Sequence, residues 1–491
     1  MMNHESLGRR QHGLAALYAA LNELKTYIFP FLLFIFFQWR RADELNVGEI
    51  WGRLGVGFGV FLLIAIYGLL KWLMFRYQMQ DGQLIVRQGI FVRKETIIPI
   101  ERVQSVDISE GLLHRLTGTV KLQVQTSGGQ KPEAVLIAVS REEALVIQRN
   151  LLETFVTTES INVQSELTVP TAPRLRKLSK IRLLLIGCTA GGLGIGLALF
   201  GSIAYQLVEF VPLRTSETVV TSWFSSLTVI FIIVIFLLVL AWFVSVVLAI
   251  IRFGNYTISR NGERLTIVRG IIERRQVTIP INRIQAIRLE EEPIWQWLGF
   301  LAVHAVSKGY GQEQEETTLL FPLLRRAELI PFLQEMVPAF AEMRLDSLHR
   351  LPRRSRASYF FLPIFCLGVV MAGVLPFTHW GWLGGIVLAG VILHGLWRHR
   401  SAGFHVSDQM LMMRNRFWKR KTLIVPRQRI QLLECIQTPL SQRNRHAILQ
   451  IAVASGGMFS GLLGFRFRIR GMDIADIDKI LDWWRTRISS T

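Results

Sequence analysis

Long apolar runs alternate with polar segments along this chain of 491 residues. About 20 apolar residues are needed to cross a bilayer as a helix. The run at 223–251 has no charged residue over its whole length, which does not suit the core helix of a soluble protein. The pattern therefore predicts a membrane protein. The clear runs are 54–75, 183–207, 223–251, 359–378 and 380–397.

A sixth run, "TYIFPFLLFIFFQW" (26–39), is short and needs the preceding "LAALYAALNEL" to complete a span. Short connections join neighbouring runs into hairpins, so we expect six transmembrane helices in three pairs. The segment "RLRKLSKIR" (174–182) is strongly basic, whereas the 208–222 connection has one arginine. Because basic residues concentrate on the cytoplasmic side, both termini and all large polar segments are expected in the cytoplasm.

One short string recurs in the polar segments: "IPIERVQSV" (98–106), "IPINRIQAI" (279–287) and "VPRQRIQLL" (425–433). In each copy an arginine follows the proline by three residues, and a glutamine follows two later. The distance from this proline to a closing glycine is 29, 29 and 30 residues. Equal order and spacing indicate an internal repeat. The recurring residues are Pro99, Arg102, Gln104, Pro280, Arg283, Gln285, Pro426, Arg429 and Gln431.

Each polar segment has a β pattern followed by a helical one. Runs such as "QLIVRQG" and "VKLQVQT" are rich in β-branched residues and are broken by Gly, Asn and Asp. The stretch 140–155 opens with Ser140 and Glu143 at capping-box spacing. The predicted fold class is α-helical membrane hairpins plus β-rich domains, each a small sandwich or open barrel with a C-terminal helix.

This organisation divides the chain into eight parts. The expected hairpins are 1–76, 183–252 and 358–398; the β-rich domains are 77–160, 253–340 and 399–491; the basic linkers are 161–182 and 341–357.

The recurring P-x-x-R-[IV]-Q string is followed in the first copy by "L-x-R-L-x-G", with Leu113, Arg115 and Gly118. Together they resemble the bacterial pleckstrin-homology-like (bacterial PH) membrane proteins, in the branch with three tandem domains. The second copy keeps Gly299 but has Gln296 in place of Arg115, and the third lacks the glycine. The resemblance implies PH-like domains at the bacterial cytoplasmic membrane. It also implies a role in envelope homeostasis or resistance to membrane-active compounds, and it provides a shorter one-domain relative as a candidate partner, besides a second copy of the chain.

The repeated arginines have two interpretations. As guanidinium groups they could contact phosphate, carboxylate or a protein partner at the rim of each domain. Alternatively, the arginine and glutamine have a structural role and connect neighbouring strands, and the proline marks a strand start or edge. Recurrence in diverged copies favours the structural interpretation.

The basic residues next to the apolar runs also have two explanations. Positive-inside topology alone would place them there, and such clusters also attract anionic headgroups at about 1 kcal/mol per charge. The residues concerned are Arg174, Arg176, Lys177, Lys180, Arg182, Arg353, Arg354 and Arg356.

The net charge of +20 suits nucleic acid or an anionic membrane surface, and the hydrophobic content of 51% favours the membrane. No common catalytic motif occurs, so we expect no enzyme activity, no cofactor, no metal and no nucleic-acid partner. The carboxylates of "EEEP" (290–293) suit a solvated turn better than a metal site.

The sequence thus favours a non-enzymatic interaction or assembly scaffold. The alternatives are a sensor of anionic lipids and a transporter or export component, although the centres of the clear spans lack acidic and basic residues. Exposed strand edges in β-rich domains would favour self-association.

Overall fold

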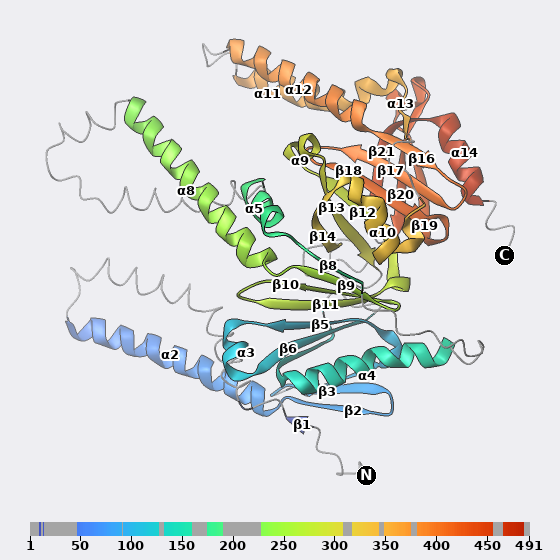
Figure 1. Ribbon diagram of the computed structural model, residues 1–491. Helices are drawn as coiled ribbons and strands as arrows, with labels where there is room; N and C mark the ends of the chain where they lie inside the picture. Colours follow the sequence, from blue (N-terminus) through green and yellow to red (C-terminus); the bar gives the residue numbers. More distant parts are fainter. Residues whose placement is uncertain are drawn as a thin grey trace. The chain divides into compact units, whose positions relative to one another are not determined.

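The computed structural model describes residues 9–10, 13, 47–90, 92–126, 132–159, 174–189, 227–307, 317–342, 348–374, 381–454 and 465–485. The chain forms two compact units (Figure 1). Unit 1 consists of Met1–Thr171 and Ile272–Thr278, and unit 2 of Ala172–Ile271 and Ile279–Thr491.

Unit 1 contains a long apolar helix, α2, and two small antiparallel sheets. The first sheet has the order β1-β2-β3-β4, and the second contains β5, β6 and β7. Helix α4 packs across β5, β6 and β7. The elements are β1 (Arg9–Arg10), α2 (Val47–Leu73), β2 (Arg76–Gln80), β3 (Gln83–Gln88), β4 (Lys94–Pro99), η2 (Ile100–Arg102), β5 (Val103–Glu110), α3 (Leu112–Thr117), β6 (Thr119–Thr126), β7 (Ala134–Ser140) and α4 (Arg141–Glu159).

Alternation with a period of two builds the core of unit 1. Leu84 and Val86 on β3 and Leu122 and Val124 on β6 are buried, as period-two strands with one apolar face require. They join one hydrophobic cluster with Leu151 of α4. The expected capping contact is present, because the backbone N–H of Glu143 donates to Ser140 Oγ at 3.2 Å.

A strand of the second repeat completes the edge of unit 1. Residues Arg274–Thr278 of β11 (Arg274–Pro280) pair antiparallel with β5, and Arg274 faces Glu110. The side chain of Gln148 on α4 donates to Thr278 Oγ1 at 3.3 Å. The sheet of the first repeat is therefore extended by a strand from the next.

Unit 2 contains the remaining parts of repeats two and three. Its strands form β8-β9-β10, then β14-β13-β12-β18-β17-β16-β15, and β19-β20-β21. The elements up to the third repeat are β8 (Arg174–Lys177), α5 (Lys180–Thr189), α8 (Leu227–Phe253), β9 (Thr257–Asn261), β10 (Arg264–Arg269), η4 (Ile281–Arg283), β12 (Ile284–Glu291), α9 (Pro293–Leu298), β13 (Phe300–Ser307), β14 (Thr318–Arg325), η5 (Arg326–Glu328), α10 (Leu329–Met336) and η6 (Pro338–Phe340). The third repeat comprises β15 (His349–Arg350), η7 (Arg353–Arg356), α11 (Ala357–Val374), α12 (Gly381–Ser401), β16 (Gly403–Val406), β17 (Met410–Arg416), β18 (Arg420–Pro426), η9 (Arg427–Arg429), β19 (Ile430–Ile436), α13 (Pro439–Arg443), β20 (His446–Val453), β21 (Phe465–Asp473) and α14 (Ile474–Arg485).

Strand pairing between repeats recurs inside unit 2. Strand β18 of the third repeat pairs antiparallel with β12 of the second, and Arg420 faces Glu291. Relative to the repeated prolines, the register of β12 with β18 is the same as the register of β5 with β11. In both pairs, the residue six before one proline faces the residue eleven after the preceding repeat's proline.

The prediction of six transmembrane helices in three pairs is wrong. Within the described ranges, one helical segment, Gly55–Leu73, is long and apolar enough to cross a membrane, and the chain is β-rich with four sheets. Part of the apolar sequence serves protein packing: Ile186 of α5 and Ala249 of α8 share a buried cluster with Trp295 and Phe300. Hydropathy alone does not distinguish such packing from lipid contact. The run 26–39 lies outside the described residues, as do 190–207 and 375–378.

Candidate functional site

Strand β21 places three arginines along one face of the last sheet. In "FRFRIR" (465–470) the apolar residues Phe465, Phe467 and Ile469 are buried in the core of the third repeat. The intervening Arg466 and Arg468 are exposed, and Arg470 is half-buried. Because side chains alternate between the faces of a strand, the same pattern that fixes the core aligns these cations outside it.

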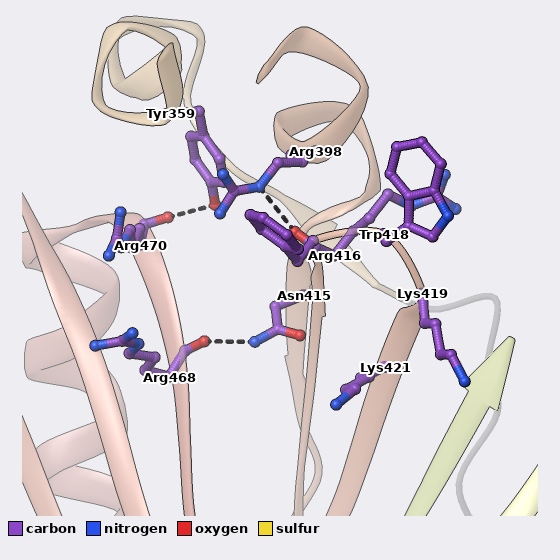
Figure 2. Close-up of a pocket in the computed structure, with 10 residues that line it drawn as sticks. Tyr359, Arg398, Asn415, Arg416, Trp418, Lys419, Lys421, Arg468 and Arg470 are labelled. Atoms are coloured by element: carbon purple, nitrogen blue, oxygen red, sulfur yellow. Dashed lines mark hydrogen bonds between the residues drawn. The ribbon is translucent and has the colours of Figure 1, made fainter. Parts of the chain in front are cut away.

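Arg468 and Arg470 line a cavity of about 400 Å³, called here the basic pocket. Its walls come from α11, α12, β17, β18 and β21, and Figure 2 shows its side chains. Six of its ten lining residues are Arg or Lys, three are aromatic and none is acidic. The lining residues are Tyr359, Arg398, Asn415, Arg416, Phe417, Trp418, Lys419, Lys421, Arg468 and Arg470.

Three hydrogen bonds to backbone carbonyls hold the walls together (Figure 2). The Tyr359 hydroxyl donates to Arg470 O at 2.7 Å, and Asn415 Nδ2 donates to Arg468 O at 2.8 Å. Arg398 Nε donates to Arg416 O at 3.0 Å. The apolar helices and the β domain therefore share one framework, and the side chains of Arg468 and Arg470 take no part in it.

Aromatic rings position two of the guanidinium groups. The Cζ atom of Arg416 lies 3.8 Å from the centroid of the Trp397 ring. That of Arg398 lies 4.9 Å from Phe417 and 5.6 Å from Tyr359. A cation over an aromatic face is attracted by the ring quadrupole, which keeps both groups in place without neutralising them.

Arg416 is buried and incompletely paired. Its Nη2 donates to Gln296, while Nε and Nη1 have no hydrogen-bond partner among the described residues. Burial, then the neighbouring Arg420, lowers the pKa of Arg416 to about 10. The group therefore remains charged at neutral pH, and an anion entering the pocket would relieve both the unpaired donors and the repulsion.

The two lysines of the pocket already have carboxylate partners. Lys419 Nζ lies 2.7 Å from Glu292 Oε1, and Lys421 Nζ lies 3.6 Å from Glu290 Oε1. Arg420 pairs with Glu291, whose side chain is 5% exposed. The expectation of a solvated turn for 290–293 is thus corrected, because these carboxylates form an ion-pair ladder along the β12–β18 junction.

Two of the aromatic residues that line the basic pocket are also exposed to solvent. Phe417 and Trp418, at the tip between β17 and β18, are 69% and 63% exposed. Gln296 of α9 bonds to Arg416 and so places α9 beside this tip. On α9 itself, Trp297 is 92% exposed. Aromatic residues of this kind favour the boundary between lipid and water.

The repeated Pro-Arg-Gln residues lie elsewhere, at the turn that connects the two sheets of each repeat. Pro99, Pro280 and Pro426 each end a strand and precede a one-turn 3₁₀ helix. Arg102, Arg283 and Arg429 end those turns, and Gln104, Gln285 and Gln431 follow in the next strand. In the second copy, Gln285 Nε2 donates to Arg283 O at 3.0 Å.

The predicted membrane-surface basic residues fall into two groups. Arg176 pairs with Glu335 at 2.6 Å, Arg182 contacts both oxygens of Glu328 at 2.8 and 2.9 Å, and Arg354 pairs with Asp473. The second group is defined by exposure: Arg174, Lys177, Lys180 and Arg353 are exposed, and Arg356 is half-buried.

Neither the hydropathy pattern nor the repeated motif predicts the basic pocket, although two local signals in the sequence mark it. "FRFRIR" alternates apolar and basic residues with the period of a strand, and "RFWKRK" (416–421) combines aromatic and basic residues at a hairpin tip. Strand β7 contains no arginine, and β14 has one at its last position. The alternation of apolar and basic residues in β21 therefore distinguishes the third repeat from the other two.

Comparison with known proteins bears on these observations. A family model described as "Bacterial PH domain" matches residues 13–154, 210–332 and 360–488. The chain is 29% identical over 495 residues to UPF0699 transmembrane protein YdbT of Bacillus subtilis (strain 168), covering 97% of this chain and 98% of the relative. It is also 27% identical over 96 residues to UPF0699 transmembrane protein YdbS of the same organism, covering 20% and 57%. No solved structure matches it. The similarity to transmembrane proteins points to membrane association.

Proposed function

Since the chain belongs to the bacterial PH domain family, with the domain repeated three times, we propose that it is a non-enzymatic membrane protein whose third domain binds anionic lipid headgroups. The domains face the cytoplasm, and the basic pocket of the third domain accepts the phosphate group. In this role the protein reports or responds to the lipid composition of the bacterial plasma membrane.

The observation that carries this proposal is the composition of the basic pocket. Four arginines without a carboxylate in the lining converge on one cavity, and guanidinium groups recognise phosphate through paired N–H donors. The exposed Phe417 and Trp418 adjoin the cavity, so a bound headgroup would lie where aromatic side chains meet lipid. The basic residues in polar segments such as 174–182 support this orientation, because basic residues concentrate on the cytoplasmic side of a membrane.

An interaction scaffold is the second candidate. The strand pairing of β5 with β11 and of β12 with β18 favours it, because it fixes successive repeats in a regular order. Envelope homeostasis and resistance to membrane-active compounds, which the resemblance implied, suit either candidate. A lipid sensor would detect a change in the membrane lipids, and a scaffold would assemble the proteins that respond to that change.

The test uses the full chain in nanodiscs of phosphatidylcholine with increasing phosphatidylglycerol, with retained lipid counted by native mass spectrometry. We expect Arg468→Ala combined with Arg470→Ala to weaken phosphatidylglycerol retention about 30-fold, at about 1 kcal/mol for each basic residue. The backbone carbonyls that join the walls remain in this variant.

Arg466→Ala is the matched control, since Arg466 is exposed on the same face of the same strand but lies outside the pocket lining. It should change retention by no more than a general charge effect. Equal losses in Arg466→Ala and Arg468→Ala would refute a specific site. A parallel titration with inorganic phosphate separates recognition of a lipid from recognition of the free anion.

A further inference from the structure

Two strands, β4 of the first repeat and β19 of the third, occupy positions whose equivalents in the other repeats pair with a neighbouring repeat. Two junctions between repeats are built alike: β11 adds to the edge of β5, and β18 adds to the edge of β12. The strand corresponding to β11 and β18 in the first repeat is β4, and the strand corresponding to β5 and β12 in the third repeat is β19. Both lie at the edge of their sheets among the described strands.

Exposure distinguishes the terminal edge of β4 from its paired equivalents. Ile97, two residues before its repeat's proline, is 53% exposed. Thr278 and Ile424 occupy the same position in β11 and β18 and are 5% and 1% exposed. The next residue towards the start of β4, Thr96, has a buried Oγ1 without a hydrogen-bond partner in the described part of the chain.

The edge of β19 shows the same difference. Gln431 and Cys435 are exposed, whereas their equivalents in β12, Gln285 and Leu289, are 6% and 1% exposed. An open strand edge presents unpaired backbone N–H and C=O groups to other chains. Inside the chain, the edges equivalent to β4 and β19 are paired with each other twice, in the β5–β11 and β12–β18 junctions.

We propose that β19 of one copy pairs antiparallel with β4 of a second copy, in the register of the two internal junctions. This register places Glu95 opposite Cys435, because the equivalent pairs are Gln276 opposite Ile108 and Thr422 opposite Leu289. The contact is head-to-tail, since different surfaces meet, and it leads to a ring or an open row of copies.

Side chains at this junction make it weaker than the internal ones. In the internal junctions a basic residue faces a glutamate: Arg274 faces Glu110, and Arg420 faces Glu291. At the terminal junction the corresponding residue Arg93 faces Gln437, which carries no charge. The repeats within a chain stay paired while copies exchange, and shared orientation at a membrane raises the effective concentration of partners.

Disulfide crosslinking in membranes tests the register directly. Cys188 and Cys366 are replaced by Ser, Cys435 is kept, and Glu95→Cys is introduced. Directly opposed residues of an antiparallel pair have Cα atoms about 4.5–5.5 Å apart, within disulfide range. Mild oxidation should give covalent dimers, trimers and higher multiples of the 56.1 kDa chain.

Dividing the two cysteines between differently tagged copies distinguishes head-to-tail from symmetric contact. One copy carries Glu95→Cys with Cys435→Ser, and the other keeps Cys435 and Glu95. The proposal requires mixed dimers and no larger species. Dimers of the Glu95→Cys, Cys435→Ser copy with itself would overturn the head-to-tail arrangement.

Two controls keep a negative result informative. Lys94→Cys points to the opposite face of β4 and should not crosslink to Cys435. Gln276→Cys with Ile108→Cys reproduces the internal register and should close within one chain, which verifies oxidation. If the internal pair oxidises while Glu95→Cys links no better than Lys94→Cys, the proposal is wrong. Crosslinking only to a smaller protein would exclude a second copy as the occupant.

Ile97→Lys provides an independent measurement. Because Ile97 is half exposed in the single chain, this variant should fold normally and shift the mass in nanodiscs from multimers towards the single chain. Unchanged multimers would contradict pairing at this edge.

Discussion

The pair Glu291–Arg420 provides the sharpest test of how neighbouring repeats are held together. Glu291 lies at the end of β12 and its side chain is 5% exposed, while that of Arg420 on β18 is 17% exposed. Substitution Glu291→Gln keeps the size of the side chain but removes its charge. The largely covered Arg420 guanidinium then lacks its counter-ion and lies close to Arg416, whose positive charge repels it.

The expected cost is about 3–5 kcal/mol, typical of removing one partner from a buried ion pair. With about 2–4 °C per kcal/mol for a domain of 150–250 residues, the apparent melting temperature should fall by about 10 °C. The assay is thermal unfolding of the full chain in mild detergent at fixed protein concentration. Binding of β18 to β12 should weaken in parallel, as hydrogen exchange of these strands would report.

Glu292→Gln is the matched control. Its partner Lys419 is 46% exposed, and an ion pair with such exposure contributes about 0–1 kcal/mol. A double-mutant cycle with Arg420→Gln isolates the pair: Glu291→Gln with Arg420→Gln together should cost clearly less than the sum of the two. If Glu291→Gln costs no more than Glu292→Gln, or if the cycle gives no coupling, the reasoning fails.

Three further predictions follow from buried polar groups and backbone geometry. Burial, then Arg288, lowers the pKa of His304 to about 3. Between this pH and about 6.5, the unfolded chain binds a proton at this residue that the folded chain does not bind. The free energy of unfolding should therefore rise from about pH 3 to about pH 6.5 and then level off. His304→Asn should flatten that part of a melting-temperature profile, and an unchanged slope would contradict the assignment. Tyr256→Phe removes hydroxyl bonds of 2.8 and 3.0 Å to two carbonyl groups of β14 and should cost about 1–2 kcal/mol by thermal unfolding; no loss would mean that these bonds contribute nothing. Gly471 has φ +78°, and an added Cβ would lie 2.6 Å from Ser355 Cβ, so Gly471→Ala should cost at least about 1–2 kcal/mol. Adding Ser355→Gly should restore part of this loss, and the absence of any rescue would leave the strained backbone as the whole cause.

Local patterns in the sequence predicted a unit that occurs three times, and the bacterial PH domain model matches the chain in three segments. In all three copies the proline ends a strand and the arginine ends a 3₁₀ turn, because such turns depend on residues within a few positions of one another. The same holds for the cap at Ser140. Whether the repeated arginines and glutamines contact a partner stays a prediction.

The hydropathy pattern predicted too many transmembrane helices, because it depends on the composition of a segment and not on what the segment packs against. Ile186 and Ala249 are as apolar as lipid-facing residues, but they pack against Trp295 and Phe300. The local sequence of such a helix is the same whether protein or lipid covers it. Only the tertiary structure identified what covers these residues.

The pairing between repeats and the basic pocket were also decided by tertiary structure. Glu291 and Arg420 are separated by 129 positions, and the pocket joins residues from Tyr359 to Arg470. Periodicity assigns each residue to a face of its own strand or helix, so "FRFRIR" (465–470) contains the signal of an arginine face, although that signal was not used to predict the pocket. It carries no information about which strand lies at the neighbouring edge. That choice depends on which distant edges meet when the sheets pack, because backbone hydrogen bonds are the same for any strand and the selecting contacts lie far apart in the chain.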